Sequence, residues 1–297
     1  MSILVISVES DFTTNKVLQW FQYYKLPFKR INLDTNINFV EELFGLNLNE
    51  ISGYWYRRGD LTKTIYNNYD SEFQKYLTEN NKKLLEYFEY KMMKKKNLNS
   101  FFNTDINKLI VLEMAKDLGL IIPDFHLIQS TKTLDSLNYI YKTINRDGNI
   151  FDYKNKSVFN VLTQELTKHI DYNFSLTLFQ KKIEKKFEIR SFYLDGNFYS
   201  MVILSQQNEA TRIDYRAIGE HNKARMVPYS LPSSIEEKLK CLMLNIGINS
   251  GVIDIIVTPT NEYVFLEVNP VGHFGLISYA CNYNIEKKIA KFYTNEQ

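Results

Sequence analysis

Apolar and polar residues follow patterns along the chain that predict strands and helices in turn. An apolar run over residues 3–8 predicts a buried strand, and the stripe Val17, Leu18, Phe21 and Tyr24 predicts a helix after it. The sequences FKRINL and ISGYWYRR predict two further strands. Because strands and helices alternate, the amino-terminal part of the chain is expected to form an α/β lobe.

Similar patterns continue through the rest of the chain. An apolar period of 3.6 over residues 106–115, with Thr104 or Asp105 as its cap, predicts a helix. Two alternating runs flank Asp195 and Gly196, residues that tolerate the positive φ of a tight hairpin turn. The runs GVIDIIVTP and EYVFLEVNP predict a last pair of strands before an amphipathic tail helix.

Length and composition exclude several classes of protein. At 297 residues the chain is long enough for several lobes that enclose a cleft. Its formal charge of +2 argues against a strongly basic surface for nucleic acid. No apolar run approaches the roughly 18 residues that span a bilayer, and the amino terminus turns acidic too early for a secretion signal. We therefore expect a cytoplasmic protein that binds neither nucleic acid nor membranes.

Polar residues end the strand FLEVNP, where another apolar residue would serve the core equally well. Glu267 and Asn269 are two positions apart, so their side chains point to the same face. If the turn before this strand is centred between Thr260 and Asn261, Asp254 of the preceding strand lies directly opposite Glu267. Two facing carboxylates are costly unless a cation lies between them, and Mg²⁺ prefers such oxygen ligands. The alternative is that Asp254 starts a turn and Glu267 caps a loop.

Candidate cations for a phosphate group lie on neighbouring predicted elements. Arg190 shares a strand face with Glu188, Lys142 lies within an apolar strand, and Lys108 lies in the first turns of the helix after Asp105. A lysine within an apolar strand is unusual unless an anion meets it. A lysine that is paired, or that extends its amine to solvent, is the alternative at each position.

Taken in order, several segments resemble the ATP-grasp superfamily over the last two-thirds of the chain: NKLIVLEMAKDLGLIIPDF, YKTI, FQKKIEKKFEIRSFYLDGNFYSMVI, GVIDIIV and FLEVNPVGHFG. Four further motifs, YWYRR, SQ, DYR and NPVG, resemble the graspetide maturases, which install side-chain ester or amide links in microviridin-type peptides. The resemblance implies a three-lobed ATP-grasp fold, α/β and α+β in class, with ATP between the central and carboxyl-terminal lobes. The lobes would comprise residues 1–100, 101–178 and 179–297.

The resemblance also implies roles for individual residues. The metal ligands would be Asp254, Glu267 and Asn269, which would hold two Mg²⁺ ions with ATP. The ATP-binding residues would be Lys108, Lys142, Gln180, Lys181, Ile183 and Glu188, with adenine held mainly by the backbone of Lys181 and Ile183. The catalytic residues would be Arg190, Asp214 and Arg216, and a loop over residues 146–156 would act as a lid.

Some residues depart from the pattern of the family or have open roles. Lys181 stands where these enzymes often carry an acid, which backbone bonds to adenine tolerate. His273 stands where glutamine is usual, as a base for the incoming nucleophile or as a structural polar replacement. Arg57 and Arg58, at the end of YWYRR, either face a peptide carboxylate or pair with acids within the lobe.

The activity that the resemblance implies is an ADP- and phosphate-forming peptide macrocyclase. It would activate Asp or Glu side chains of a ribosomally made precursor peptide, leader plus core, and join them to Ser or Thr hydroxyls or Lys amines. One alternative is an ATP-grasp ligase that joins amino acids or adds glutamates to a protein tail. Another is a nucleotide-binding kinase or regulatory protein. A homodimer is compatible with the sequence, which does not fix the oligomeric state.

Overall fold

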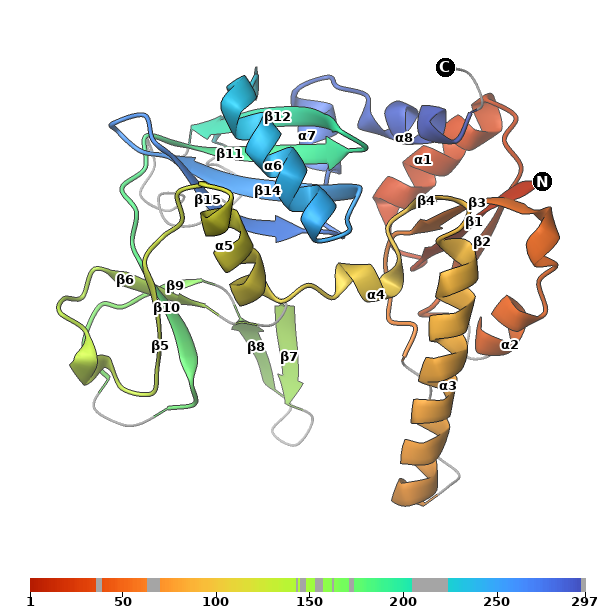
Figure 1. The fold of residues 1–297 in the computed structure, drawn as a ribbon, viewed down its shortest axis with the longest axis horizontal. Coiled ribbons are helices and arrows are strands. Elements are labelled where there is room, and N and C mark those ends of the chain that lie inside the picture. The colour runs from red at the N-terminus through yellow and green to blue at the C-terminus, as the bar shows by residue number, and fades with distance from the viewer. Residues whose placement is uncertain are drawn as a thin grey trace.

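The computed structural model describes residues 1–35, 39–62, 70–142, 144, 148–152, 157–161, 163–170, 174–204 and 224–294. Three sheets of four or five strands, with the helices packed against them, form three lobes (Figure 1). No helix in these ranges is long and apolar enough to cross a membrane.

The amino-terminal lobe is built on a parallel sheet in the order β2-β1-β3-β4. Its elements are β1 (Ser2–Ser7), α1 (Phe12–Tyr23), β2 (Phe28–Asn32), α2 (Phe39–Phe44), the 3₁₀ helix η1 (Leu48–Glu50), β3 (Ile51–Tyr56), α3 (Ser71–Met92) and β4 (Lys96–Leu98). Leu4 and Ile6 of β1 lie in one apolar cluster, and Ile3 and Val5 lie in another. The sheet is therefore covered on both faces, as a parallel sheet requires, and the predicted α/β lobe is confirmed.

The central lobe is a small antiparallel sheet in the order β5-β10-β6-β9. Its elements are β5 (Phe125–Ile128), the 3₁₀ helix η2 (Thr131–Thr133), β6 (Tyr139–Lys142), β9 (Gln164–Glu165) and β10 (Thr177–Lys181), beside a separate hairpin of β7 (Gly148–Asp152) and β8 (Ser157–Val161). One face covers a core of Tyr139, Leu166 and Phe179. The other face carries Lys142 and Gln180, and Gln180 is fully buried there.

The carboxyl-terminal lobe is an antiparallel sheet in the order β13-β12-β11-β14-β15. Its strands are β11 (Phe187–Leu194), β12 (Asn197–Leu204), β13 (Arg225–Tyr229), β14 (Ser250–Val257) and β15 (Tyr263–Asn269). The hairpin at Asp195 and Gly196 is confirmed, because Leu194 pairs with Asn197 and both turn residues have positive φ, 44° and 88°. This sheet supplies most of the charged residues that the sequence singles out.

Helices cover the two faces of this sheet. They are α5 (Lys108–Asp117), α6 (Ser233–Asn245), α7 (Gly275–Ala280) and α8 (Ile285–Tyr293), whereas the short helix α4 (Phe101–Thr104) contacts α3 of the amino-terminal lobe. The predicted cap of α5 is wrong: Asn107 accepts hydrogen bonds from Leu109 and Ile110, and residues 101–104 form the separate short helix α4. Asn107 is the cap because its short side chain can accept hydrogen bonds from two free N–H groups of the first turn. Lys108 is therefore the first residue of α5.

The amino- and carboxyl-terminal lobes share one apolar core. Helix α8 packs against α1 (Figure 1), and Ile289 and Tyr293 of α8 lie in the same cluster as Val17 of α1 and Val252 of β14. The central lobe has its own small core instead. The amino-terminal lobe thus packs against one face of the carboxyl-terminal lobe through this shared core. The boundaries assigned to the lobes from the sequence stay predictions.

Candidate active site

Strand register brings three charged side chains into a line, and the start of helix α5 adds a fourth. Arg190 of β11 pairs with Asp254 of β14, which in turn pairs with Glu267 of β15. The Nη1 atom of Arg190 lies 3.3 Å from Oδ1 of Asp254, and Nζ of Lys108 lies 3.4 Å from Oε2 of Glu267. We call Lys108, Glu267, Asp254 and Arg190 the charged row. The predicted pairing of Asp254 with Glu267 is confirmed.

The turn that produces this pairing differs from the predicted one. Val257 pairs with Tyr263, which centres the turn on Thr260, and Asn261 takes a positive φ of 64°. The register then shifts between Asp254 and the next residue, so β15 has one extra residue at that point. A three-residue loop with a left-handed residue is a common hairpin turn, and the bulge in β15 lies three residue pairs further from the turn. The two deviations cancel, and Asp254 still faces Glu267.

The side chains of the charged row are largely buried, and its two positive charges offset its two negative charges. Its side chains keep between 11% and 21% of their surface exposed, and each carboxylate has its own cation. Two facing carboxylates would otherwise repel in a poorly solvated site. Arginine and lysine are also the residues that bind phosphate. Arg190 and Lys108 are therefore the residues of the charged row that are suited to contact a phosphate.

The donor set at the end of the row fits a magnesium ion. Asn269 lies two residues beyond Glu267 on β15, and its side chain is exposed. No group of three His, Cys, Asp or Glu side chains with metal-binding geometry occurs within the described ranges. Two carboxylates and one amide oxygen leave several positions for water and phosphate, which suits Mg²⁺ better than a metal that needs a closed protein cage.

Glu188 lies on the same strand face as Arg190 and is held by a neighbouring cation. Lys185 contacts its carboxylate, and both side chains are largely buried. Glu188 and Arg190 share a face because two residues separate equivalent positions of a strand. The predicted neighbourhood of these two residues is confirmed.

The face of the central sheet opposite its apolar core carries a buried amide that has no partner among the described residues. Gln180 is 0% exposed, and neither Oε1 nor Nε2 of its side chain has a hydrogen-bond partner among the described residues. Lys142 pairs with Leu178, two residues before Gln180, so Lys142 and Gln180 lie on one face. Buried polar groups are normally bonded, so an orphan amide indicates a missing ligand or water. The N–H of Lys181 donates to Asp124, which leaves only its carbonyl for an outside donor.

Arg57 pairs with an acid of its own lobe. Its side chain is almost fully buried, and its Nε lies 3.2 Å from Oδ2 of Asp11. Nη1 donates to the carbonyl of Val271 at 2.8 Å, and the guanidinium lies 5.1 Å from the ring centre of Phe274. Burial lowers the pKa of Arg57 to about 10, against the opposing effect of Asp11. Of the two roles left open by the sequence, the described contacts favour pairing within the lobe.

The acid partner of Arg57 was not predicted from the sequence. Asp11 caps α1, and its carboxylate also accepts from the hydroxyls of Thr13 and Thr14. Burial acts to raise the pKa of Asp11, but Arg57 and these hydroxyls outweigh it, so the pKa is lowered. The pattern Asp-x-Thr-Thr at the start of a helix predicts that Asp11 caps the helix. It does not predict the contact of Asp11 with Arg57, which is distant in sequence.

Arg58 and His273 meet where the amino-terminal lobe touches the turn after β15. Nη2 of Arg58 lies 3.1 Å from Nε2 of His273 and donates to the carbonyl of Val271. Burial, together with the charges of Arg58 and Arg57, lowers the pKa of His273. His273 is therefore neutral at pH 7, and its Nε2 accepts from Arg58. Unlike Arg57, the Arg58 side chain is 30% exposed.

Asn99 is a positioning residue that the sequence analysis missed. Its Nδ2 donates to the carbonyls of Ser250 and Pro270 at 2.6 and 3.2 Å, and its Oδ1 accepts from the N–H of Asn249 and of Ser250. Asn99 thereby ties the start of β14 to the residue that follows Asn269. Its φ of 57° explains the choice of Asn, which tolerates the left-handed region.

Several predicted features fall outside the described residues. Asp214 and Arg216 lie outside them, and the expected lid over residues 146–156 is described only as the backbone of β7. Two surface hollows, of about 400 and 630 Å³, are lined by α3 and by residues around α8 respectively. Neither contains a residue of the charged row.

No protein-family model matches the chain, and no curated protein matches its sequence. Solved structures match it along almost its whole length. The macrocyclase MdnC of Microcystis aeruginosa MRC, bound with the precursor peptide MdnA, has a TM-score of 0.77 at 22% identity and covers 100% of both chains. The RiPP-associated ATP-grasp ligase of Chryseobacterium gregarium, in complex with ADP and a leader and core peptide, has a TM-score of 0.73 at 23% identity over 98% and 95% of the two chains.

This chain has the ATP-grasp fold. D-alanine–D-alanine ligase of Bacillus anthracis shares it more distantly, with a TM-score of 0.60 at 14% identity over 98% and 95% of the chains. The three-lobed ATP-grasp architecture expected from the sequence is confirmed. Within this ATP-grasp fold, the charged row lies on the carboxyl-terminal sheet and the orphan amide lies on the central sheet.

Proposed function

We propose that this chain is an ATP-dependent macrocyclase that activates Asp or Glu side chains of a ribosomally made precursor peptide and joins them to Ser or Thr hydroxyls or Lys amines. The charged row carries the proposal, because it combines two facing carboxylates with two cations on the sheet of an ATP-grasp fold. Two solved structures of this fold are described as complexes with a precursor or a leader and core peptide, which supports a peptide substrate here.

The residues present fit ATP and magnesium. Asp254, Glu267 and Asn269 would hold Mg²⁺, in two ions, and bound there the metal would neutralise charge on the phosphates. Gln180 would hydrogen-bond the adenine from the central sheet, together with the carbonyl of Lys181 and the N–H of Ile183. A polar base edge would satisfy a buried amide that otherwise lacks a partner.

Cations of the chain would serve the phosphates. Lys142 lies on the same face as Gln180, and Lys108 and Arg190 flank the two carboxylates. Glu188 would fix the position of the amine of Lys185 beside Arg190. Strand register and the start of α5 place the backbone of these residues before a ligand arrives, so only the side chains of Lys108 and Arg190 would move from the carboxylates to the phosphates.

The reaction would proceed in two steps. A substrate carboxylate oxygen attacks the γ-phosphorus of ATP, ADP leaves, and an acyl-phosphate forms. A hydroxyl or amine of the same peptide then attacks the acyl carbon, and phosphate leaves as the ring closes with the net loss of one water. Arg190 would stabilise the charge on the phosphoryl oxygens in transfer, and Asp214 and Arg216 would act in the same pocket.

Arg58 and His273 are the proposed contacts for the peptide. They meet at the edge of the amino-terminal lobe, and Arg58 keeps part of its guanidinium exposed. Among its described hydrogen bonds, the neutral imidazole has no acidic partner. The bond that its Nε2 accepts from Arg58 holds the ring in one orientation. A substrate carboxylate would contact Arg58, and His273 would act as base only after the bond between them opens.

Mass spectrometry of candidate precursor peptides incubated with the chain, ATP and Mg²⁺ tests this function. The expected product is lighter by one water per ring, with ADP and phosphate released. Added residue mass would indicate an amino-acid or glutamate ligase, and added phosphate would indicate a kinase. No change with any peptide carrying Asp or Glu beside Thr, Ser or Lys would favour a nucleotide-binding regulatory protein.

Gln180→Leu should weaken nucleotide binding about tenfold and leave the ligand-free protein at least as stable as the parent. The substitution removes a buried amide whose lack of a partner costs about 1–3 kcal/mol, and with it the proposed bond to adenine. Calorimetric titration with ADP and thermal unfolding would measure the two effects. Gln164→Leu is the matched control, since Gln164 is exposed and bonded to Tyr141 in the same lobe. Unchanged ADP affinity together with a less stable protein would contradict the assignment.

A further inference from the structure

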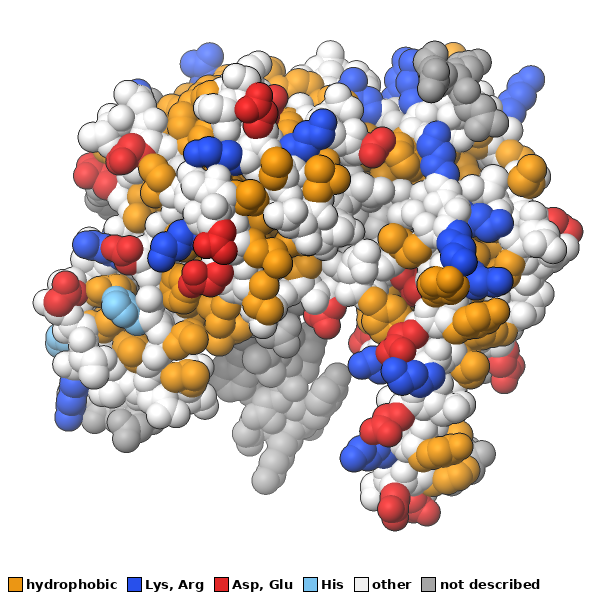
Figure 2. Space-filling view, in the orientation of Figure 1, with side chains coloured by type: hydrophobic (Ala, Val, Ile, Leu, Met, Phe, Trp, Pro, Cys, Tyr) orange, Lys and Arg blue, Asp and Glu red, His pale blue; other side chains and the backbone are white. Residues whose placement is uncertain are grey.

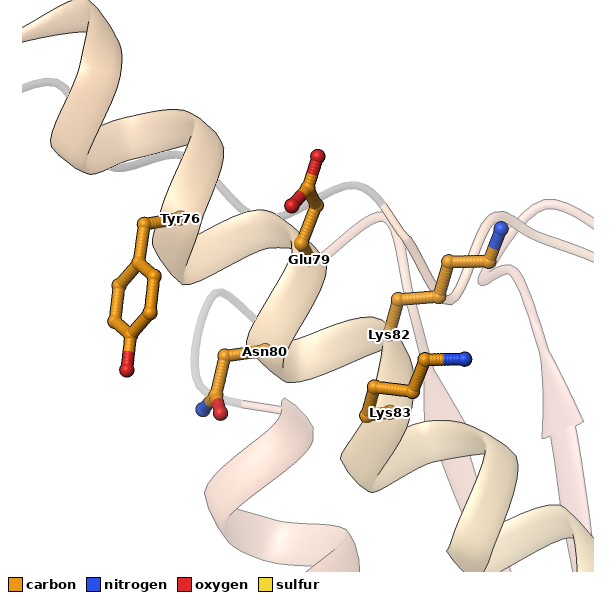
Figure 3. A pocket seen from close by; sticks show the side chains of 5 residues that line it. All are labelled: Tyr76, Glu79, Asn80, Lys82 and Lys83. Atoms are coloured by element: carbon orange, nitrogen blue, oxygen red, sulfur yellow. The ribbon is translucent and has the colours of Figure 1, made fainter.

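Two surface hollows of the described structure differ in their balance of charge. The hollow on α3 is lined by Tyr76, Glu79, Asn80, Lys82 and Lys83 (Figure 3). Its two lysines share the hollow with Glu79, and Lys83 also pairs with Glu86 at 2.7 Å. Figure 2 shows Lys and Arg side chains interleaved with acids along the lower right, where Figure 1 places α3. The positive charges of this hollow are therefore offset by acids beside them.

The hollow beside α8 is larger and has an excess of positive charge. Its volume of about 630 Å³ lies within the range of sites that bind small molecules. One wall is formed by Lys287, Lys288 and Lys291 of α8, and the other walls include Tyr199 of β12, Tyr229 of β13 and Glu236 of α6. We call this space the α8 hollow. Three lysines thus share it with a single acid.

The lysines of the α8 hollow have no acid that neutralises them. The ion pairs of the described structure involve none of these three lysines. Glu286, the acid next to them on α8, accepts from the hydroxyl of Ser278 instead. Lys287 and Lys291 are four residues apart, and like charges at that spacing destabilise a helix. A cluster that breaks this rule without a compensating contact favours an anionic ligand.

Aromatic rings hold two of the ammonium groups in place. The Nζ atom of Lys288 lies 4.9 Å from the ring centre of Tyr199, and that of Lys287 lies 5.2 Å from the ring centre of Trp20. A ring face attracts a cation without neutralising its charge. The rings also replace water on one side of the ammonium groups, which strengthens their attraction for an anion.

The spacing of the lysines suits a compact anion with several charges. Residues three and four apart on a helix have Cβ atoms about 5–6 Å apart, so the three ammonium groups can reach one phosphate or two linked phosphates. Lysine is a point charge that binds phosphate well. Carboxylates on one side of an extended peptide are about 7 Å apart and would meet the three lysines less closely. The cluster therefore favours a phosphate over an acidic peptide.

Glu236 adds a different kind of contact to the α8 hollow. It lies on α6, across from the helix that carries the lysines, and burial raises its pKa. A carboxylate repels phosphate but accepts hydrogen bonds from hydroxyl groups. A ligand that suits both the lysines and Glu236 therefore carries hydroxyls as well as phosphate.

We propose that the α8 hollow binds a phosphate ester that carries hydroxyl groups, such as a nucleotide or a sugar phosphate. The three lysines contact the phosphate, and Glu236 accepts a hydrogen bond from a hydroxyl. None of these residues belongs to the charged row, so this site is separate from the candidate active site. The proposal is therefore independent of the ligase activity.

Calorimetric titration of the full chain with ADP, and separately with fructose bisphosphate, tests the proposal and distinguishes the two sources. At least one of the probes should bind at the α8 hollow, ADP as a second site per chain. Replacing the three lysines with glutamine should weaken this binding by at least about a hundredfold, and Glu236→Gln should weaken it about tenfold. The matched control is Lys82→Gln with Lys83→Gln in the hollow on α3, which should leave both affinities within about twofold of the parent.

Three results would overturn the proposal. One is that neither probe binds at millimolar concentration outside the site that Gln180→Leu weakens. Another is that the lysine variants of the two hollows weaken binding equally. A third is that inorganic triphosphate binds the α8 hollow as tightly as either ester and ignores Glu236→Gln, which would make the hollow a place for an adventitious ion only. None of the replaced side chains is buried, so circular dichroism should show an unchanged fold.

Discussion

Replacing Glu267 with glutamine should abolish the loss of water from the precursor peptide while the chain stays folded. The carboxylate lies opposite Asp254 at the end of the charged row, so its charge is needed to hold a divalent ion there. Loss of one such preorganised group typically costs about 3 kcal/mol of barrier, or at least a hundredfold in rate. The rate of ADP release and the mass of the peptide measure the effect, and thermal unfolding checks the fold.

Glu262→Gln is the matched control for this variant. Glu262 lies in the turn of the same hairpin, is exposed and bonds only to residues of that turn in the described structure. It should leave the rate within about twofold of the parent, because it does not face the row. Cyclisation retained in Glu267→Gln at the rate of the control would refute the metal assignment. A variant that loses activity and also unfolds would leave the row with a structural role only.

Arg57→Leu should lower the free energy of unfolding by about 3–5 kcal/mol, enough to leave much of the protein unfolded at 37 °C. The change strands the buried carboxylate of Asp11 and removes the donor to Val271 and the contact with Phe274. Those contacts join the amino-terminal lobe to the turn after β15. Urea unfolding followed by circular dichroism measures the loss.

Arg58→Leu provides the comparison for Arg57→Leu. The Arg58 side chain is partly exposed and lies 3.8 Å from Asp11, so its removal should cost about 1 kcal/mol or less. The variant should instead raise the KM for the peptide. If Arg57→Leu unfolds no more easily than Arg58→Leu and only peptide binding is lost, the alternative that Arg57 faces a substrate carboxylate is correct.

The charged row was largely predictable because strand periodicity determines which side chains share a face. Asp254 and Glu267 were paired correctly from the alternation together with an assumed turn centre between Thr260 and Asn261. The turn between the two strands was not predicted correctly. A two-residue turn, and a three-residue turn combined with a bulge, lead to the same pairing of Asp254 with Glu267. The α/β class of the amino-terminal lobe was predictable for a related reason, because the order of strands and helices restricts the layers that can form. The three-lobed ATP-grasp fold was expected from the resemblance of the motifs instead.

Other parts of the site depend on contacts between residues that are distant in sequence. Arg57 follows β3 and Asp11 precedes α1, just after β1. The two residues are in contact because β3 lies beside β1, which no local sequence pattern predicts. Gln180 was expected to bind ATP only from the resemblance, because local periodicity does not show that its amide is buried without a partner among the described residues.

Anomalous diffraction from crystals of the chain grown with ADP and Mn²⁺ tests the central claim most directly. The account predicts a manganese peak in contact with the carboxylates of both Asp254 and Glu267, with Arg190 and Lys108 moved toward the phosphates. A peak elsewhere, with Asp254 still paired to Arg190 and Glu267 still paired to Lys108, would contradict it.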